Sequence, residues 1–76
     1  MFTSSEVAHR IKSHAKSKGV AVKNLLEACD LNKNTLSNMQ SGGFFPRAET
    51  IVRIADYLDC SVDYLLGRTD KPEVNR

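Results

Sequence analysis

Residues 20–42, VAVKNLLEACDLNKNTLSNMQSG, decide the fold of this 76-residue chain. The spacing of their apolar side chains predicts two short helices, over residues 22–29 and 33–40, with Asp30 at a tight turn between them. Asn32 is placed to cap the second helix, because its side chain can accept a hydrogen bond from a free backbone N–H. The inward faces of the two helices would consist of apolar residues, namely Leu25, Leu26, Cys29, Leu31, Leu36 and Met39.

The remaining positions of the second helix form a surface that differs from an ordinary solvated one. All are polar, all can form hydrogen bonds and none is acidic: Lys33, Asn34, Thr35, Ser37 and Asn38. An exposed helix face usually includes Glu or Asp. Asn can bond adenine N6 and N7 together, and Lys can donate to guanine O6 and N7. The pair is therefore typical of a helix-turn-helix whose second helix contacts DNA bases.

The segment before this stretch also has helical spacing. Its apolar positions are Val7, Ala8, Ile11 and Ala15. Ser4 or Ser5 would cap this helix and Gly19 would end it, which predicts a helix over residues 5–18.

Two more helices are predicted after a loop that contains Pro46, which cannot lie inside a helix. The first has apolar residues at helical spacing, at Ile51, Ile54, Ala55 and Leu58. The second covers residues 62–66, with Ser61 as its cap and Gly67 at its end.

These helices predict an all-α fold, a compact five-helix bundle that contains a helix-turn-helix. No alternation typical of β-strands occurs in the sequence. Residues 1–68 would form a single domain, and residues 69–76 a loose C-terminal tail with little apolar content.

Composition favours a small globular domain of the cytoplasm. Apolar residues make up 41% of the chain and charged residues 26%. No run approaches the roughly 20 apolar residues of a membrane span, and the N-terminal residues do not resemble a secretion signal. Cys29 and Cys60 are expected to be buried free thiols, with a disulfide or a redox role as the alternative.

Charge is distributed unevenly along the chain. Residues 1–47 hold seven Lys or Arg against three Asp or Glu, and residues 48–76 hold four against six. The net charge of +2 is thus divided as +4 and −2. A basic front half and an acidic rear half favour a small DNA binder with a separate face for another contact.

Nothing in the sequence indicates catalysis or a metal site. His9 and His14 stand five residues apart and make no zinc spacing with the two cysteines. No nucleophile–base pair, phosphate-binding loop or paired-carboxylate site is recognisable. We therefore expect no cofactor, no metal and no enzymatic activity.

Residues 7–68 resemble the Cro/repressor-type helix-turn-helix family, also called the XRE family. Three parts carry the resemblance: GVAVKNLLEACDLNKNTLSNMQSG, the loop at Pro46, and ETIVRIADYLDCSVDYLLGRT. It implies a lambda-repressor-like domain that places residues 33–40 in the major groove of double-stranded DNA, as a homodimer on a pseudo-palindromic operator. The implied function is a transcriptional regulator, most simply a repressor, of phage, prophage or mobile-element type.

The resemblance also assigns roles to individual residues. The base contacts would be Lys33, Asn34, Ser37 and Asn38. The contacts to the DNA backbone would be Val22, Lys23, Asn32, Thr35, Ser41 and Arg47. The dimer interface would be formed by Tyr57, Tyr64, Leu65 and Leu66.

Five positions depart from the family pattern. Ala21-Val22 replaces the usual Thr-Gln, Leu26 replaces a small residue, and Asp30 replaces a glycine and must adopt the left-handed conformation. Gln40 replaces a glutamate. Of Phe44 and Phe45, one is expected to pack under the loop. Two interpretations stay open for the other: an isolated exposed apolar residue, or a contact with the sugar-phosphate backbone or a partner.

These departures leave an alternative function open. The chain would then be a protein-interaction module of the same fold, an antirepressor, an adaptor or an antitoxin half, with weak affinity for DNA.

Overall fold

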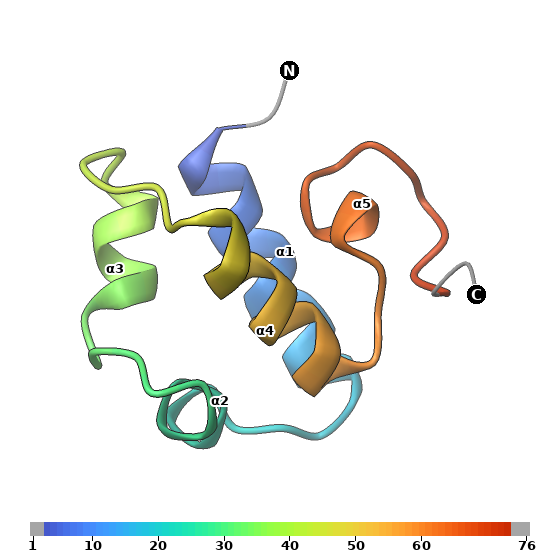
Figure 1. Ribbon diagram of the computed structural model, residues 1–76, viewed down its shortest axis with the longest axis horizontal. Coiled ribbons are helices and arrows are strands. Elements are labelled where there is room, and N and C mark those ends of the chain that lie inside the picture. The colour runs from blue at the N-terminus through green and yellow to red at the C-terminus, as the bar shows by residue number, and fades with distance from the viewer. Residues whose placement is uncertain (1–2, 74–76) are drawn as a thin grey trace.

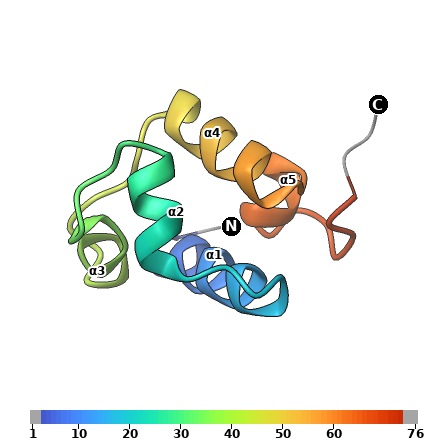
Figure 2. The same ribbon diagram turned by 90° about the horizontal axis from the view of Figure 1, so that it is seen from below.

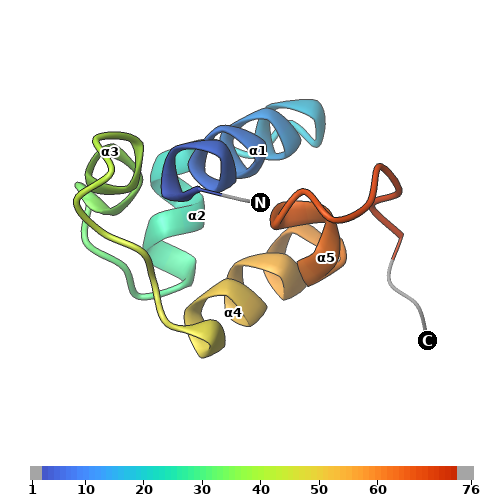
Figure 3. The same ribbon diagram turned by 90° about the horizontal axis from the view of Figure 1, so that it is seen from above.

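The computed structural model describes residues 3–73. Five α-helices follow one another in this part of the chain, and it contains no strand, so the predicted all-α five-helix fold is confirmed. They are α1 (Ser4–Ser17), α2 (Val22–Ala28), α3 (Thr35–Gln40), α4 (Ala48–Leu58) and α5 (Val62–Leu65). α1 and α4 form the centre, with α2 and α3 towards one end of the domain and α5 at the other (Figures 1 and 3).

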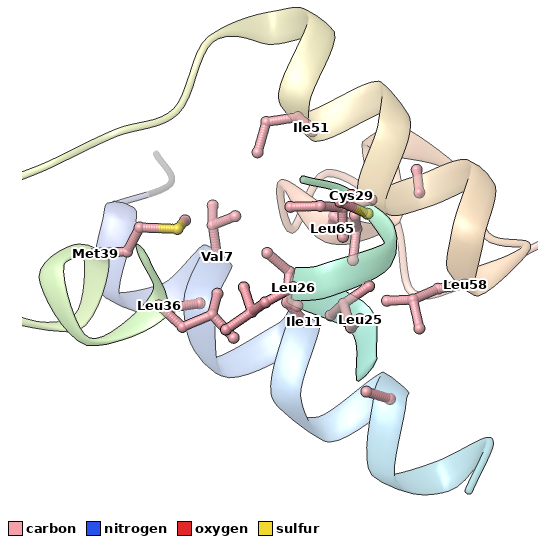
Figure 4. Packing of buried hydrophobic residues seen from close by; sticks show 14 of the residues in the cluster. Val7, Ile11, Leu25, Leu26, Cys29, Leu36, Met39, Ile51, Leu58 and Leu65 are labelled. Carbon is pink, nitrogen blue, oxygen red and sulfur yellow. The ribbon is translucent and has the colours of Figure 1, made fainter. Parts of the chain in front are cut away.

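The core draws side chains from all five helices (Figure 4). The inward positions of α1 and α4 are those predicted from helical spacing, and Val7, Ile11 and Ile54 are fully buried. Leu26, at the position that departs from the family pattern, is also buried, with 5% of its surface exposed. Burial of each such side chain stabilises the fold by about 1.5–3 kcal/mol before the entropy cost is counted.

The N-terminal cap of α1 differs from the prediction. Thr3 is the capping residue, and its Oγ1 accepts a hydrogen bond of 3.1 Å from the backbone N–H of Glu6. Ser4 was expected as a cap, but its hydroxyl donates to the carbonyl of Met39 at the end of α3 instead. The predicted Ser61 cap of α5 is confirmed, since its Oγ accepts from the N–H of Tyr64 at 3.0 Å.

All five helices end in the same backbone turn. In α2, the Leu31 N–H bonds to the Leu26 carbonyl (2.8 Å) and the Asp30 N–H bonds to the Glu27 carbonyl (3.1 Å). This pattern requires a left-handed residue after the helix. Asp30 supplies it with φ 57°, as predicted. The other left-handed residues at helix ends are Gly19, Gly42, Asp59 and Gly67.

The segment after α5 returns to the domain. The Ser61 N–H donates to the Pro72 carbonyl at 2.8 Å, so the chain is attached as far as Pro72 rather than loose from residue 69. The last three residues of the expected tail lie outside the described part. Where the domain ends therefore stays a prediction.

Both cysteines are buried, as predicted, with 1% and 2% of their surfaces exposed. They are free thiols, and burial raises the pKa of each. Cys29 is the C-cap of α2, and Cys60 lies between α4 and α5.

Candidate nucleic-acid interface

α2 and α3 are consecutive helices joined by a turn that two asparagines organise (Figure 2). Asn32 Oδ1 accepts from the backbone N–H of Asn34 at 2.8 Å, and the Asn32 carbonyl accepts from the N–H of Thr35 at 3.0 Å. Residues 33 and 34 are therefore part of the turn, and α3 begins later than predicted. Asn32 stabilises this turn instead of capping α3, which corrects its expected role.

Exposed polar side chains form one stripe along α3. Asn34, Ser37, Asn38 and Ser41 occupy positions i, i+3, i+4 and i+7, which places them on the same side of the helix. We call these four residues the recognition face. All are exposed, and Asn34, as the N-cap, makes no capping bond through its side chain to any described residue. Its amide is thus available to a ligand.

The opposite side of α3 faces the core. Leu36 and Met39 are buried, as predicted, and so is Thr35, with 6% of its surface exposed. The prediction that Thr35 is an exposed position contacting the DNA backbone was therefore wrong. The polarity of its side chain gave a misleading indication of exposure.

α1 holds α3 through two hydrogen bonds that sequence reasoning missed. Ser4 Oγ donates to the Met39 carbonyl at 2.8 Å, and Lys12 Nζ donates to Gln40 Oε1 at 2.7 Å. Gln40 departs from the family pattern, but no sequence pattern connects it with a lysine 28 positions earlier. These bonds fix the C-terminal end of the recognition face relative to α1.

Lys33 and the first turn of α2 share a groove of about 450 Å³. It is lined by Val22, Lys23, Leu26, Glu27, Leu31 and Lys33. Lys23 and Lys33 are exposed, whereas Val22 is half-buried against the core. The N-cap of α2 is Ala21, which has no side-chain acceptor to offer, as its departure from the family pattern implies.

The far end of α2 is attached to α4. Arg53 Nη1 donates to the Cys29 carbonyl at 3.1 Å, and this bond satisfies one of the carbonyls at the end of the helix. Arg47, which was predicted to contact the DNA backbone, is exposed at the N-terminus of α4, where the loop from α3 ends.

The predicted dimer residues do not form one surface. Leu65 is fully buried in the core, so its assignment to an interface was wrong. Tyr64 is half-buried between Arg10 and His14, with its ring centroid 5.1 Å from that of His14. Tyr57 is 43% exposed on α4. Leu66, on the other hand, lines an apolar depression of about 250 Å³ between α4 and α5.

Two phenylalanines in the loop before α4 are both exposed, at 44% for Phe44 and 43% for Phe45. The expectation that one of them packs under the loop was wrong. Phe45 lines the same depression as Leu66, together with Val52 of α4. The apolar surface of the domain is thus concentrated beside α4 rather than on α5.

No cluster of metal-ligating side chains is found among residues 3–73. His9 is exposed, whereas His14 is buried, and its Nε2 has no hydrogen-bond partner within this range. Burial and the nearby Lys18 lower the pKa of His14.

None of the described helices has both the length and the apolar content to cross a membrane.

Taken together, the α2–turn–α3 geometry and the polar stripe define a helix-turn-helix domain. A sequence model of the Cro/C1-type HTH DNA-binding domain matches residues 10–71, and the chain belongs to that family. Membership indicates binding of double-stranded DNA and a part in transcription regulation. No curated protein and no solved structure matches the chain.

Proposed function

We propose that this protein is a sequence-specific regulator that acts in the cytoplasm by occupying an operator. A repressor of phage, prophage or mobile-element type is the simplest such role. The recognition face carries the proposal, because four exposed, non-acidic polar side chains follow one side of α3. Such a stripe can enter the major groove, where every base pair presents a distinct set of donors and acceptors.

In this proposal, the two asparagines of the recognition face read adenine through bidentate hydrogen bonds. Ser37 lies between them, and Lys33 approaches guanine at the N-terminal border of the face. Ser41 and Asn32 are exposed at the two ends of α3 and, with Lys23 and Arg47, contact phosphates. Thr35 has no part in binding, because it is buried.

We further propose that the protein binds as a homodimer. One half-site offers few contacts, and a second one about 34 Å away along the duplex would double them. The exposed apolar residues beside α4 support this face as the interface: Phe45, Val52, Tyr57 and Leu66. Sedimentation of the Val52→Glu variant tests it, since a charge here should shift the protein towards monomer. An unchanged association state would exclude this face.

Selection from a random duplex library tests the proposal, with the bound pool sequenced at near-physiological salt. A short motif that appears twice with two-fold symmetry is the expected result. An unenriched pool from a protein that circular dichroism shows to be helical would contradict operator recognition.

The exposed phenylalanines favour one second candidate, the protein-interaction module. Phe44 and Phe45 expose apolar surface next to each other, which suits a protein partner as well as a second copy. Salt dependence separates the two functions. Phosphate contacts make log K fall steeply with log salt, whereas a partner bound by apolar contacts gives a shallow slope.

A further inference from the structure

The groove between α2 and the turn before α3 has features that a phosphate contact alone does not explain. Its floor is apolar and consists of Val22, Leu26 and Leu31. Val22 and Leu31 are only half-buried, so their methyl groups remain accessible from outside. Phosphates are contacted by Lys, Arg, hydroxyl and N–H groups, and none of the three side chains of the floor offers such a group.

The groove adjoins the recognition face. Lys33 lines the groove and immediately precedes Asn34, the first residue of that face. α2 forms the other wall of the groove and is joined to α3 through the turn that holds Lys33 (Figure 2). A duplex that occupied the recognition face and extended past Lys33 would place a base edge or sugar opposite Val22 and Leu31.

The charge of the groove suits DNA. Lys23 and Lys33 are exposed on its rim and Glu27 is the single acidic side chain in its lining, so the lining carries a net charge of +1. The two lysines attract phosphates on either side of the groove, while the apolar floor can contact an apolar group between them. In the major groove only thymine presents such a group, its C5 methyl.

We propose that Val22 is a specificity-determining residue that contacts the C5 methyl of a thymine bordering the bases read by α3. This inference rests on the proposed function, since it requires that the recognition face occupy the major groove. It gives Val22 a role in reading sequence, beyond the backbone contact first expected of it.

The test uses the operator obtained from selection, with each thymine replaced in turn by uracil, which lacks only the methyl group. At one position of each half-site, the wild-type protein should bind the uracil duplex roughly fourfold more weakly, the value expected for one lost methyl contact. The Val22→Ala variant should bind the thymine and uracil duplexes equally. Val20→Ala, the same change at another half-buried valine that does not line the groove, should keep the wild-type difference.

Thermal melting of both variants establishes that they are folded. If no thymine in the motif is sensitive to loss of its methyl group, the inference is overturned. It is also overturned if the uracil penalty persists undiminished in Val22→Ala. An unenriched selection would instead overturn the proposed function itself, so the two failures are distinguishable.

Discussion

The Ser4 hydroxyl donates a hydrogen bond to the Met39 carbonyl, 35 residues away in the sequence, across 2.8 Å. This bond connects the first turn of α1 with the last turn of α3. It acts beside the Lys12–Gln40 bond of 2.7 Å. The orientation of the recognition face therefore depends on α1, which contributes none of the residues proposed to contact DNA.

Replacement of Ser4 by alanine should lower the free energy of unfolding by about 0.5–1.5 kcal/mol. The loss should lie at the lower end, because the Met39 carbonyl still accepts from the Gly42 N–H at 3.1 Å. Urea unfolding measures the change. Ser5→Ala is the matched control, since Ser5 is an exposed neighbour on the same helix. Equal losses in the two variants would show that the bond to Met39 contributes nothing.

Replacement of Asp30 by glycine should stabilise the domain by up to about 1 kcal/mol. Asp30 has φ 57°, a conformation that glycine adopts without steric cost. The thermal midpoint measures the gain. At Asp56, within α4, the same substitution should instead destabilise the helix by about 0.3 kcal/mol, the difference between the helix propensities of Asp and Gly. A lower midpoint for Asp30→Gly would mean that the carboxylate has a favourable role of its own.

The stability of the fold should fall as the pH decreases below about 6.5. His14 has its pKa lowered below its ordinary value of 6.5, chiefly by burial. The unfolded chain therefore takes up a proton at a pH where the folded chain does not, and protonation favours unfolding. The stabilising contribution of neutral His14 is fully present above pH 6.5. It is lost as the pH falls from 6.5 through the lower pKa that His14 has in the folded state.

Unfolding curves between pH 5 and 8 test this effect. The His14→Leu variant should lose this part of the pH dependence, whereas His9→Leu should retain it, since His9 is exposed. The same slope in the wild type and in His14→Leu would assign the pH dependence to other groups.

Replacement of Lys23 by glutamine should weaken DNA binding about equally for all sequences. A lysine that contacts a phosphate contributes counterion release, so the slope of log K against log salt should decrease by about one. Lys71→Gln provides the control, because Lys71 is exposed in the segment after α5. A change of sequence preference in Lys23→Gln would contradict a pure backbone contact.

Helical spacing was sufficient to predict the five helices and most of the core. Ile51 and Ile54 in α4 are buried as their spacing requires, and Asp30 adopts the left-handed conformation that the turn demands. These features depend on local geometry and on a strong apolar periodicity. Both are present in the sequence itself.

Other features depend on contacts between distant parts of the chain. Thr35 is polar yet buried, which depends on how α3 packs on the rest of the domain. Leu65 belongs to the core rather than to an interface, and this depends on how α5 docks on α1 and α4. The Lys12–Gln40 bond joins two exposed side chains, so no burial pattern could have indicated it.

The central claim, that the recognition face reads bases, is tested most directly by parallel selections. The wild type and the Asn34→Ala variant are given the same random duplex library, with Asn24→Ala as a control on the exposed side of α2. Base reading by Asn34 predicts that its variant loses the preference at one position per half-site and binds the wild-type motif about 1–3 kcal/mol more weakly. Asn24→Ala should return the wild-type motif. The same motif from all three proteins, at equal affinity, would contradict the role of Asn34 in recognition.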